Sequence, residues 1–265
     1  MTAPAPDTPF RTLPDLIGEH ARLRPNHPAL RDERDTLSYA ELDALMDRIA
    51  AALQRDGVQP GQAIAICATA SVRYAALFMG ALRAGVVVAP LAPSSTADSL
   101  ASMLRDADAR LLFVDASTHD RLPAPSAARP RIALDGSAGG HAWGDWLAPA
   151  GARPQPVAIA PDAPFNIIYS SGTTGTPKGI VQSHGMRWAH IQRGSVYDYG
   201  PQGSTLLATP LYSNTTLVVF VPTLAYGGCV VLMPKFDALH YLQLAQQHRI
   251  THTMLVPVQY QRIMA

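Results

Sequence analysis

Short apolar segments alternate with amphipathic segments along the first half of the chain. Residues 62–68, 86–90 and 110–115 are apolar and bounded by turn residues, as buried strands are. Between them, residues 71–84 and 97–106 carry apolar side chains at helical spacing. Strands and helices that alternate at this spacing predict a parallel or mixed sheet with helices on its faces. The expected fold class is therefore α/β, with sheets flanked by helices.

Local signals place further elements on either side of this region. A helix is expected from about Thr12, and Ser38 with Glu41 forms a capping box before a helix that stops at Gly57. A short hairpin joins residues 29–31 to 36–38, and residues 122–164 form an irregular excursion rich in Pro, Ala and Gly. The run 217–224 is a buried helix or strand, with helix favoured. Further strands are expected at residues 206–209, 229–233 and 252–256, and helices at 184–195, 238–248 and 258–264. The 238–248 helix is expected to carry Leu239, Leu242 and Ala245 on one apolar face.

Composition excludes several classes of protein. The chain has 265 residues, of which 48% are hydrophobic and 15% charged, and this balance suits a globular domain with a large core. The net charge is +1 and no basic run interleaves with aromatics, which argues against nucleic-acid binding. No apolar run reaches the ~18 residues of a membrane span, and the N-terminus lacks the pattern of a signal peptide. Two cysteines in apolar surroundings suggest buried thiols and a cytoplasmic protein.

The most informative motif follows the apolar run 165–169. It reads Ser-Ser-Gly-Thr-Thr-Gly-Thr-Pro-Lys-Gly, from Ser170 to Gly179. Glycines let a backbone approach a ligand closely, and consecutive backbone N–H groups in such a turn form a concave anion site. Four hydroxyl groups at its start and a lysine near its end add donors and positive charge. The motif therefore predicts a polyphosphate site directly after a strand.

Commoner phosphate motifs do not fit this segment. A Walker A loop needs Gly-Lys-Ser/Thr, whereas Lys178 lies between Pro177 and Gly179. A dinucleotide fingerprint needs Gly-x-Gly-x-x-Gly, whereas the three glycines here are spaced three and four residues apart.

The segment from Tyr169 to Gly179, with Ile180 to His184 after it, resembles the phosphate-loop signature of the adenylate-forming enzymes. These are the acyl-CoA synthetases, the adenylation domains of nonribosomal peptide synthetases and the luciferases. Residues 36–42, 80–91, 209–212 and 251–264 are also similar to family segments, so the likeness runs from about residue 12 to the end. The family's magnesium-binding Thr-Glu pair, ribose-binding Asp, hinge and C-terminal lid with its Lys would lie beyond residue 265. We therefore expect the N-terminal portion of such an enzyme, with phosphate binding and little catalysis by this chain alone.

The resemblance implies a reaction in two steps. A carboxylate attacks the α-phosphate of ATP, pyrophosphate leaves, and a thiol such as coenzyme A then takes the acyl group from the adenylate. It implies ATP with Mg²⁺, whose main ligand is expected in the absent part, and coenzyme A as co-substrate. The catalytic residues implied are Lys178 and Thr174, and the nucleotide-binding residues are Ser170, Ser171, Gly172, Thr173, Thr174, Gly175, Thr176, Lys178 and Gly179. Preorganised donors of this kind stabilise the charge that develops on the phosphates.

The acid site is assigned by resemblance to Tyr212, Ser213 and Asn214. Many relatives carry a His where Ser213 stands, so a polar turn after Pro210 is an equal alternative. His184 is expected to be structural. His248 and His252 have the i,i+4 spacing of a metal pair, but no third ligand is evident, and we predict no metal site.

Three functions compete. Peptide-synthetase domains usually carry Tyr-x-Pro-x-Asp after the core-segment glycine, and the stretch from Val88 to Ala92 lacks both Tyr and Asp. This favours an ATP-dependent acyl-CoA synthetase over a peptide-synthetase adenylation fragment. A nucleotide-binding pseudoenzyme is the third possibility.

Apolar residues at 217–220 and 254–258 suggest a fatty or aryl acid. The expected division is a first α/β subdomain over 1–205 and the start of a second over 206–265.

Overall fold

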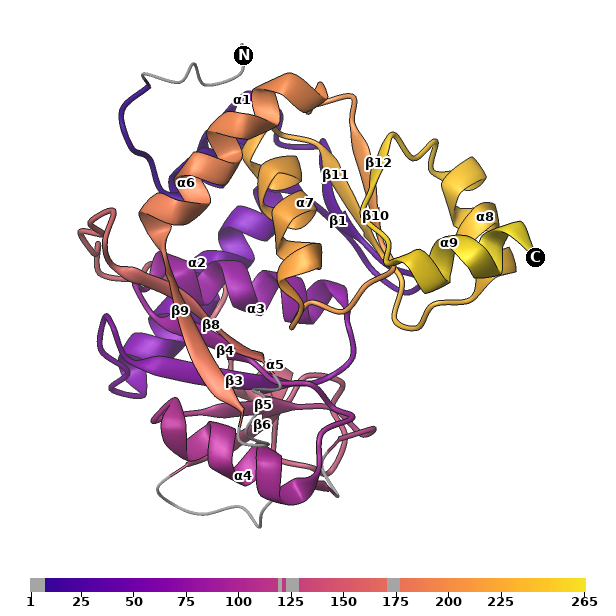
Figure 1. Cartoon of the computed structure of the whole chain (residues 1–265). Coiled ribbons are helices and arrows are strands. Elements are labelled where there is room, and N and C mark those ends of the chain that lie inside the picture. Colours follow the sequence, from indigo (N-terminus) through magenta and orange to yellow (C-terminus); the bar gives the residue numbers. More distant parts are fainter. Residues whose placement is uncertain (1–7, 119–120, 123–128, 171–176) are drawn as a thin grey trace. The chain divides into compact units, whose positions relative to one another are not determined.

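A computed structural model describes residues 8–118, 121–122, 129–170 and 177–265 (Figure 1). The chain divides into two compact units, each with its own sheet. One unit comprises Ala44–Thr69 and Ala76–His184, and we call it the seven-stranded unit. The other comprises Met1–Asp43, Ala70–Ala75 and Gly185–Ala265, and we call it the five-stranded unit. Both units are interleaved along the chain, and the division between residues 205 and 206 stays a prediction.

The sheet of the seven-stranded unit is parallel except at one edge. Its order within the described residues is β7-β6-β5-β3-β4-β8-β9, and β9 alone runs antiparallel, against β8. Every residue of β3 and β4 is buried, as expected where helices cover both faces of a parallel sheet. The strands are β3 (Ala63–Cys67), β4 (Val87–Pro90), β5 (Leu112–Val114), β6 (Arg131–Ala133), β7 (His141–Ala142), β8 (Pro164–Ser170) and β9 (Lys178–Ser183).

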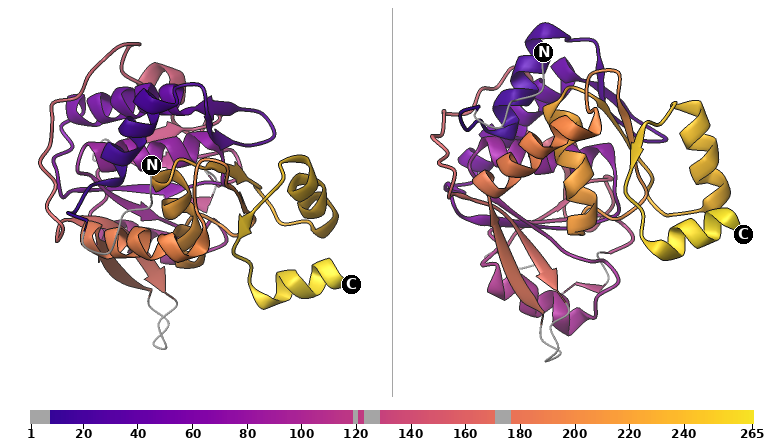
Figure 2. Two further views of the ribbon diagram at one scale, coloured as in Figure 1. Left: turned by 90° about the horizontal axis from the view of Figure 1, so that it is seen from above. Right: turned by 45° about the horizontal axis from the view of Figure 1, so that its top comes forward.

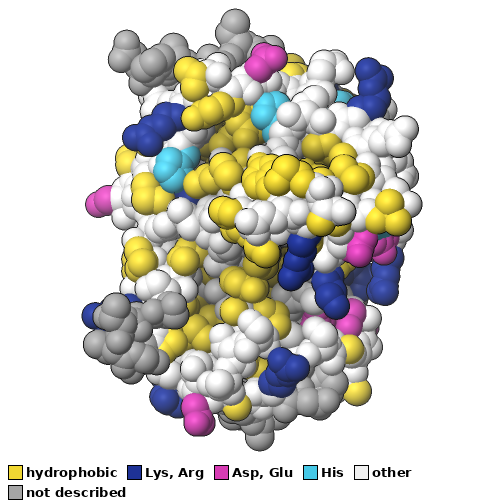
Figure 3. All heavy atoms as spheres, turned by 45° about the vertical axis from the view of Figure 1, so that its right-hand side comes forward, with side chains coloured by type: hydrophobic (Ala, Val, Ile, Leu, Met, Phe, Trp, Pro, Cys, Tyr) yellow, Lys and Arg dark blue, Asp and Glu magenta, His cyan; other side chains and the backbone are white. Residues whose placement is uncertain are grey.

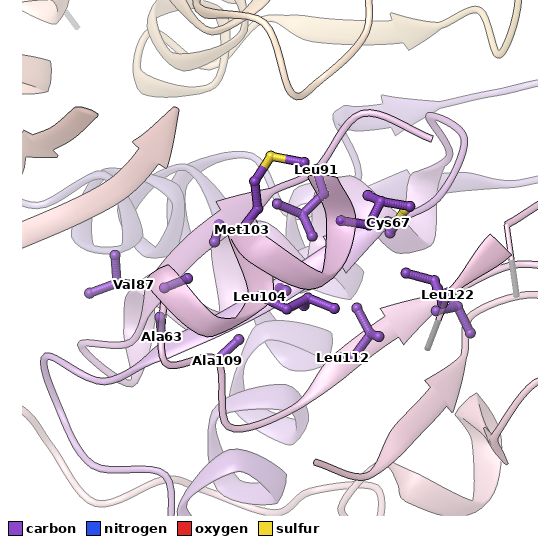
Figure 4. Close-up of a cluster of buried hydrophobic side chains, with 14 residues drawn as sticks. Ala63, Cys67, Val87, Leu91, Met103, Leu104, Ala109, Leu112 and Leu122 are labelled. Carbon is purple, nitrogen blue, oxygen red and sulfur yellow. The ribbon is translucent and has the colours of Figure 1, made fainter. Parts of the chain in front are cut away.

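Helix α4 (Ala97–Asp106) covers one face of this sheet (Figure 4). Its apolar side chains, among them Met103 and Leu104, pack against residues of β3, β4 and β5 such as Cys67 and Leu112. Thr96 caps the start of the helix by accepting a hydrogen bond from the Ser99 amide. Because this helix is fixed by the core, its C-terminal residue Asp106 has a defined position beside β8 and β9.

Three more helices belong wholly or partly to this unit. Helices α2 (Tyr39–Arg55) and α3 (Val72–Arg83) approach closely at Gly80, where a β-carbon would lie 2.6 Å from Cβ of Ile49. The short helix α5 (Trp143–Trp146) buries both of its tryptophans against Phe113. Phe113 is therefore the packing partner of both tryptophans, although they lie in an otherwise irregular segment.

The five-stranded unit has a second mixed sheet, in the order β12-β10-β11-β1-β2, with β2 antiparallel to β1. The strands are β1 (Pro28–Arg31), β2 (Thr36–Ser38), β10 (Ser204–Leu207), β11 (Cys229–Leu232) and β12 (His252–Thr253). Its helical elements are α1 (Leu13–Leu23), α6 (His184–Arg193), the 3₁₀ helix η2 (Gly194–Tyr197), α7 (Asn214–Ala225), α8 (Ala238–Gln247) and α9 (Pro257–Met264). The first residue of α6, His184, still belongs to the seven-stranded unit. The expected α/β fold with helix-flanked sheets is confirmed.

Helix α7 holds this unit together. Its Leu217, Phe220 and Leu224 side chains are fully buried, so the run 217–224 is helical, as the sequence favoured. The buried Tyr39 hydroxyl donates toward the carbonyl oxygens of Gly228, at 2.9 Å, and Leu224, at 3.2 Å. These bonds attach the start of α2 to the turn after α7.

Two local expectations need correction at the C-terminal end of the chain. The sequence placed Leu239 and Leu242 with Ala245 on one face of α8, but the helix buries Tyr241 and Leu244 and leaves Leu239 66% exposed. The strand expected over 252–256 is only His252–Thr253. Helices α8 and α9 lie side by side, as the yellow segments in Figure 2 show.

Large hydrophobic side chains are exposed on and near these two helices. They are Leu239, Leu242, Met254, Val256, Val258, Tyr260 and Met264. Hydrophobic side chains gather at the surface of the face shown in Figure 3. No helix of the described residues is long and apolar enough to cross a bilayer.

Candidate functional site

The predicted phosphate motif connects β8 to β9. Strand β8 runs parallel to β4, with Val88 opposite Asn166, so the motif leaves the sheet at the carboxyl ends of the parallel strands. Ligands of open α/β sheets bind at that edge. Ser171, Gly172, Thr173, Thr174, Gly175 and Thr176 lie outside the described residues. The described members of the motif are Ser170, Lys178 and Gly179, with Pro177 between the loop and β9.

Ser170 and Lys178 face each other across the hairpin. They are directly paired in the antiparallel ladder, so their side chains fall on the same face. Both residues are exposed to solvent. Lysine is rare in this chain, since only Lys178 and Lys235 are present against nineteen arginines. A hydroxyl and an ammonium group therefore come together where the motif begins and ends, and both can donate to an anion.

Gly179 has a packing reason to lack a side chain. It is paired with Tyr169, and a β-carbon at Gly179 would lie 2.9 Å from Oδ2 of Asp106 and 2.9 Å from Cγ2 of Ile167. The Tyr169 hydroxyl donates toward Asp106 Oδ2, at 2.8 Å, and lies 3.0 Å from the Met103 carbonyl oxygen. Burial and the neighbouring carboxylate raise the pKa of Tyr169 above its usual range. Sequence analysis missed Asp106, which lies 63 residues before Tyr169 and in no motif.

The segment assigned to acid binding lies in the five-stranded unit, after β10 and up to the first residue of α7, Asn214. Ser213 is the N-cap of α7, and its hydroxyl accepts a hydrogen bond of 3.3 Å from the Thr215 amide. Asn214 is exposed and Tyr212 partly so. Thr216 holds the preceding turn, because its hydroxyl donates to the Pro210 carbonyl at 2.7 Å. Ser213 thus has a local role in helix capping, and acid binding by these three residues stays a prediction.

His184 is a structural residue by its surroundings. It is 3% exposed, its ring meets Phe165 edge to face with 5.0 Å between centroids, and burial lowers its pKa to about 4. The imidazole is therefore neutral at pH 7 and packs against an aromatic side chain of the core.

The two spaced histidines of the C-terminal region have other partners. Nδ1 of His248 lies 3.1 Å from an Arg31 guanidinium nitrogen, and Nε2 of His252 lies 2.7 Å from the Tyr197 carbonyl oxygen. In the described part of the chain, no group of three or more His, Cys, Asp or Glu could hold a metal ion. Both cysteines are free and buried, and burial raises the pKa of Cys67 to about 12 and that of Cys229 to about 11.

Comparison with known proteins places this arrangement in a family. The family model of the AMP-binding enzymes matches residues 17–265. The chain is 31% identical over 264 residues to the indoleacetate–CoA ligase of Aromatoleum aromaticum, a match that covers 96% of this chain and 51% of the ligase. It is 30% identical over 269 residues to the nonribosomal peptide synthetase gloA of Glarea lozoyensis, across 96% of this chain and 4% of that protein.

A solved structure agrees with the fold. The inhibitor-bound N-terminal domain of FACL13 from Mycobacterium tuberculosis superposes with a TM-score of 0.84 at 23% identity, over 96% of this chain and 65% of that one. The chain thus spans about half the length of the curated CoA ligase that it matches and corresponds to the N-terminal portion of such proteins. It belongs to the AMP-binding enzymes, the adenylate-forming superfamily.

Proposed function

We propose that this chain is the phosphate-binding N-terminal portion of an ATP-dependent acyl-CoA synthetase. One observation carries the proposal: the segment Ser170–Gly179 joins two paired strands at the carboxyl edge of a parallel sheet, in a chain of the AMP-binding family. The complete reaction would join a carboxylic acid to coenzyme A, with ATP split into AMP and pyrophosphate.

Charge neutralisation is the role proposed for Lys178. In adenylate formation the acid attacks the α-phosphate and the bond to the β-phosphate breaks, so negative charge accumulates on the leaving pyrophosphate. An ammonium group on a flexible four-carbon stem can follow that group as it leaves. Thr174 and the hydroxyl and amide groups around it would supply the remaining donors, and Mg²⁺ would enter with ATP. Losing one such donor costs about 10²–10³ in rate in well-studied enzymes.

The acyl-CoA branch is favoured by the residues in the second half of β4 and directly after it. The stretch Val88–Ala92 lacks the Tyr and Asp of the peptide-synthetase pattern. Relatives of both kinds match this chain, so the branch remains part of the proposal. A nucleotide-binding protein without turnover is the alternative for a chain of this extent.

A fatty or aryl acid is the proposed substrate class, and only one of the two apolar segments noted in the sequence supports it. Leu217 and Phe220 are fully buried inside the five-stranded unit and fill its core. Met254 and Val256 are 37% and 38% exposed, so they are available to an apolar ligand. The proposed preference therefore rests on the segment around β12 and the start of α9.

Titration calorimetry with the 265-residue chain tests the phosphate-binding part. We expect ATP to bind more tightly than AMP, because the β- and γ-phosphates add charge near Lys178, and we expect tripolyphosphate to compete. Lys178→Ala should weaken ATP binding about tenfold or more, the cost of one charge-assisted hydrogen bond. Lys235→Ala is the matched control, because Lys235 is exposed and lies in the other unit. Equal weakening by both substitutions would contradict a specific role for Lys178.

A further inference from the structure

We infer that Tyr169 and Asp106 are positioning residues that hold Ser170 and Lys178 where they meet phosphate. The inference rests on the proposed function and deepens it, because it names the contact that orients the two described phosphate donors. Neither residue needs to touch the nucleotide.

The contact joins the hairpin to a helix fixed by the core. Tyr169 precedes the last residue of β8, and its ring packs against the cluster that α4 forms with the sheet. Its hydroxyl reaches the C-terminal end of α4, where Asp106 Oδ2 lies 2.8 Å away. A hydrogen bond to a charged acceptor is stronger than one between neutral groups. The end of β8 is thereby fastened to an element that the hydrophobic core holds in place.

The same carboxylate also abuts β9. Gly179 is opposite Tyr169, and Oδ2 of Asp106 occupies the space beside Gly179 that a side chain would need. One oxygen atom therefore contacts a side chain from β8 and lies beside the backbone of β9, at the residues next to Ser170 and Lys178. Movement of either strand relative to α4 would break the hydrogen bond or open this close contact.

The hairpin end has reason to depend on such a contact. Strand β9 is the edge of the sheet, and Lys178, Gly179, Ile180 and Val181 are all exposed. Donors that bind an anion tightly must be held close to their productive geometry by supporting contacts. Ser170 and Lys178 are themselves exposed, so we expect their positions to depend on neighbours such as Tyr169 and Asp106.

The test compares variants by ATP affinity and by amide hydrogen exchange. Tyr169→Phe keeps the ring and removes the hydroxyl. Asp106→Ala removes the carboxylate acceptor and its contact beside Gly179, and it leaves the Met103 carbonyl oxygen as the second acceptor of the Tyr169 hydroxyl. Each should weaken ATP binding about three- to tenfold, because the lost hydrogen bond acts on ATP only indirectly and lowers the affinity by part of its free energy. Each should also speed exchange at the Gly179 and Ile180 amides. Asp106→Asn keeps an acceptor oxygen without the charge, so its ATP affinity should lie between those of Asp106→Ala and the unchanged chain.

Tyr226→Phe is the matched control. Its hydroxyl donates to the Ile191 carbonyl oxygen at 2.8 Å, within the five-stranded unit. It should lower the melting temperature while leaving ATP affinity and the exchange of β9 unchanged. If Tyr169→Phe behaves in the same way, Tyr169 is a stabilising residue only and the inference is wrong.

The design separates this inference from the function on which it rests. If the unchanged chain binds no ATP, the proposed function fails. Hydrogen exchange then still decides whether Tyr169 and Asp106 hold the hairpin. If Tyr169→Phe does not fold, Asp106→Ala answers the same question, because Asp106 is an exposed side chain whose loss leaves the core intact. Unaltered exchange and affinity in Asp106→Ala would overturn the inference.

Discussion

Protonation of His184 should destabilise the seven-stranded unit in acid. Burial lowers the pKa of this imidazole to about 4, whereas an unfolded histidine has a pKa near 6.5. The unfolded chain therefore takes up a proton as the pH falls below 6.5, and the folded chain does so only near pH 4. The stability contributed by neutral His184 is complete above pH 6.5 and is lost as the pH falls toward 4.

Linkage gives the size of this effect. Between pH 7 and pH 5 the two pKa values correspond to a loss of about 2 kcal/mol in the free energy of unfolding. His184 is 3% exposed, so solvent screening reduces this value little. Other buried histidines with a lowered pKa, such as His20, change stability in the same direction. Their contribution is removed by comparing the chain with the His184→Leu variant, whose new side chain has similar volume and no titratable group.

Urea unfolding at pH 7, 6 and 5 measures the difference. Trp143 and Trp146 lie in the same unit as His184, and Trp188 lies in the other. Trp188→Phe in both proteins makes the fluorescence report the seven-stranded unit alone. From pH 7 to pH 5 the protein that retains His184 should lose about 2 kcal/mol more than the His184→Leu variant. Parallel pH dependences in the two proteins would refute the reasoning.

Three further predictions concern packing and buried polar groups, each measured by denaturant unfolding. Gly80→Ala should cost about 1–3 kcal/mol, because the new β-carbon meets Ile49, whereas Gly144→Ala, with nothing within 4 Å, should be neutral or stabilising. Asp47→Ala should cost about 2 kcal/mol, because the 7%-exposed carboxylate accepts hydrogen bonds from Arg83 and Arg153. Glu33 is the exposed control, because its carboxylate lies 2.9 Å from Nε2 of His240 at the surface, and Glu33→Gln should cost under about 0.5 kcal/mol. Tyr39→Phe should cost about 1–2 kcal/mol, since the buried Gly228 carbonyl oxygen loses the Tyr39 hydroxyl as its donor, whereas the Leu224 carbonyl oxygen keeps the Gly227 amide. An unchanged stability would show that the Gly228 carbonyl oxygen finds another donor.

Signals confined to one element were interpreted correctly from the sequence. The capping box is formed, with the Ser38 amide donating to Glu41 at 2.8 Å and the Glu41 amide donating to the Ser38 hydroxyl at 3.3 Å. Gly57 and Gly85 end their helices with positive φ angles of 77° and 69°. Such features depend on neighbours within a few residues, and these neighbours are visible in the sequence.

Features that depend on distant partners were missed. Strand β1 pairs with β11, about 200 residues later, so the five-stranded sheet has no signature in the alternation of strands and helices. The buried face of α8 also could not be predicted from local sequence, for the same reason. Apolar residues occur around the whole helix, and the cluster with Val231 and Leu255 decides that Tyr241 and Leu244 are buried.

The candidate site divides along the same line. The motif itself could be found from its residue types and order, and its place after a strand is confirmed by β8. Asp106 could not be found, because only the fold brings the end of α4 to Tyr169 and Gly179. Gly179 was interpreted as a ligand-binding residue, and the structure adds that no side chain fits there.

Lysine footprinting tests the central claim most directly. The chain has two lysines, both exposed, in different units, so acetic anhydride labelling followed by mass spectrometry reports both in one sample. If Ser170–Gly179 binds the phosphates of ATP, saturating ATP should slow acetylation of Lys178 severalfold and leave Lys235 unchanged. Equal labelling of Lys178 with and without ATP, or equal protection of both lysines, would contradict the account.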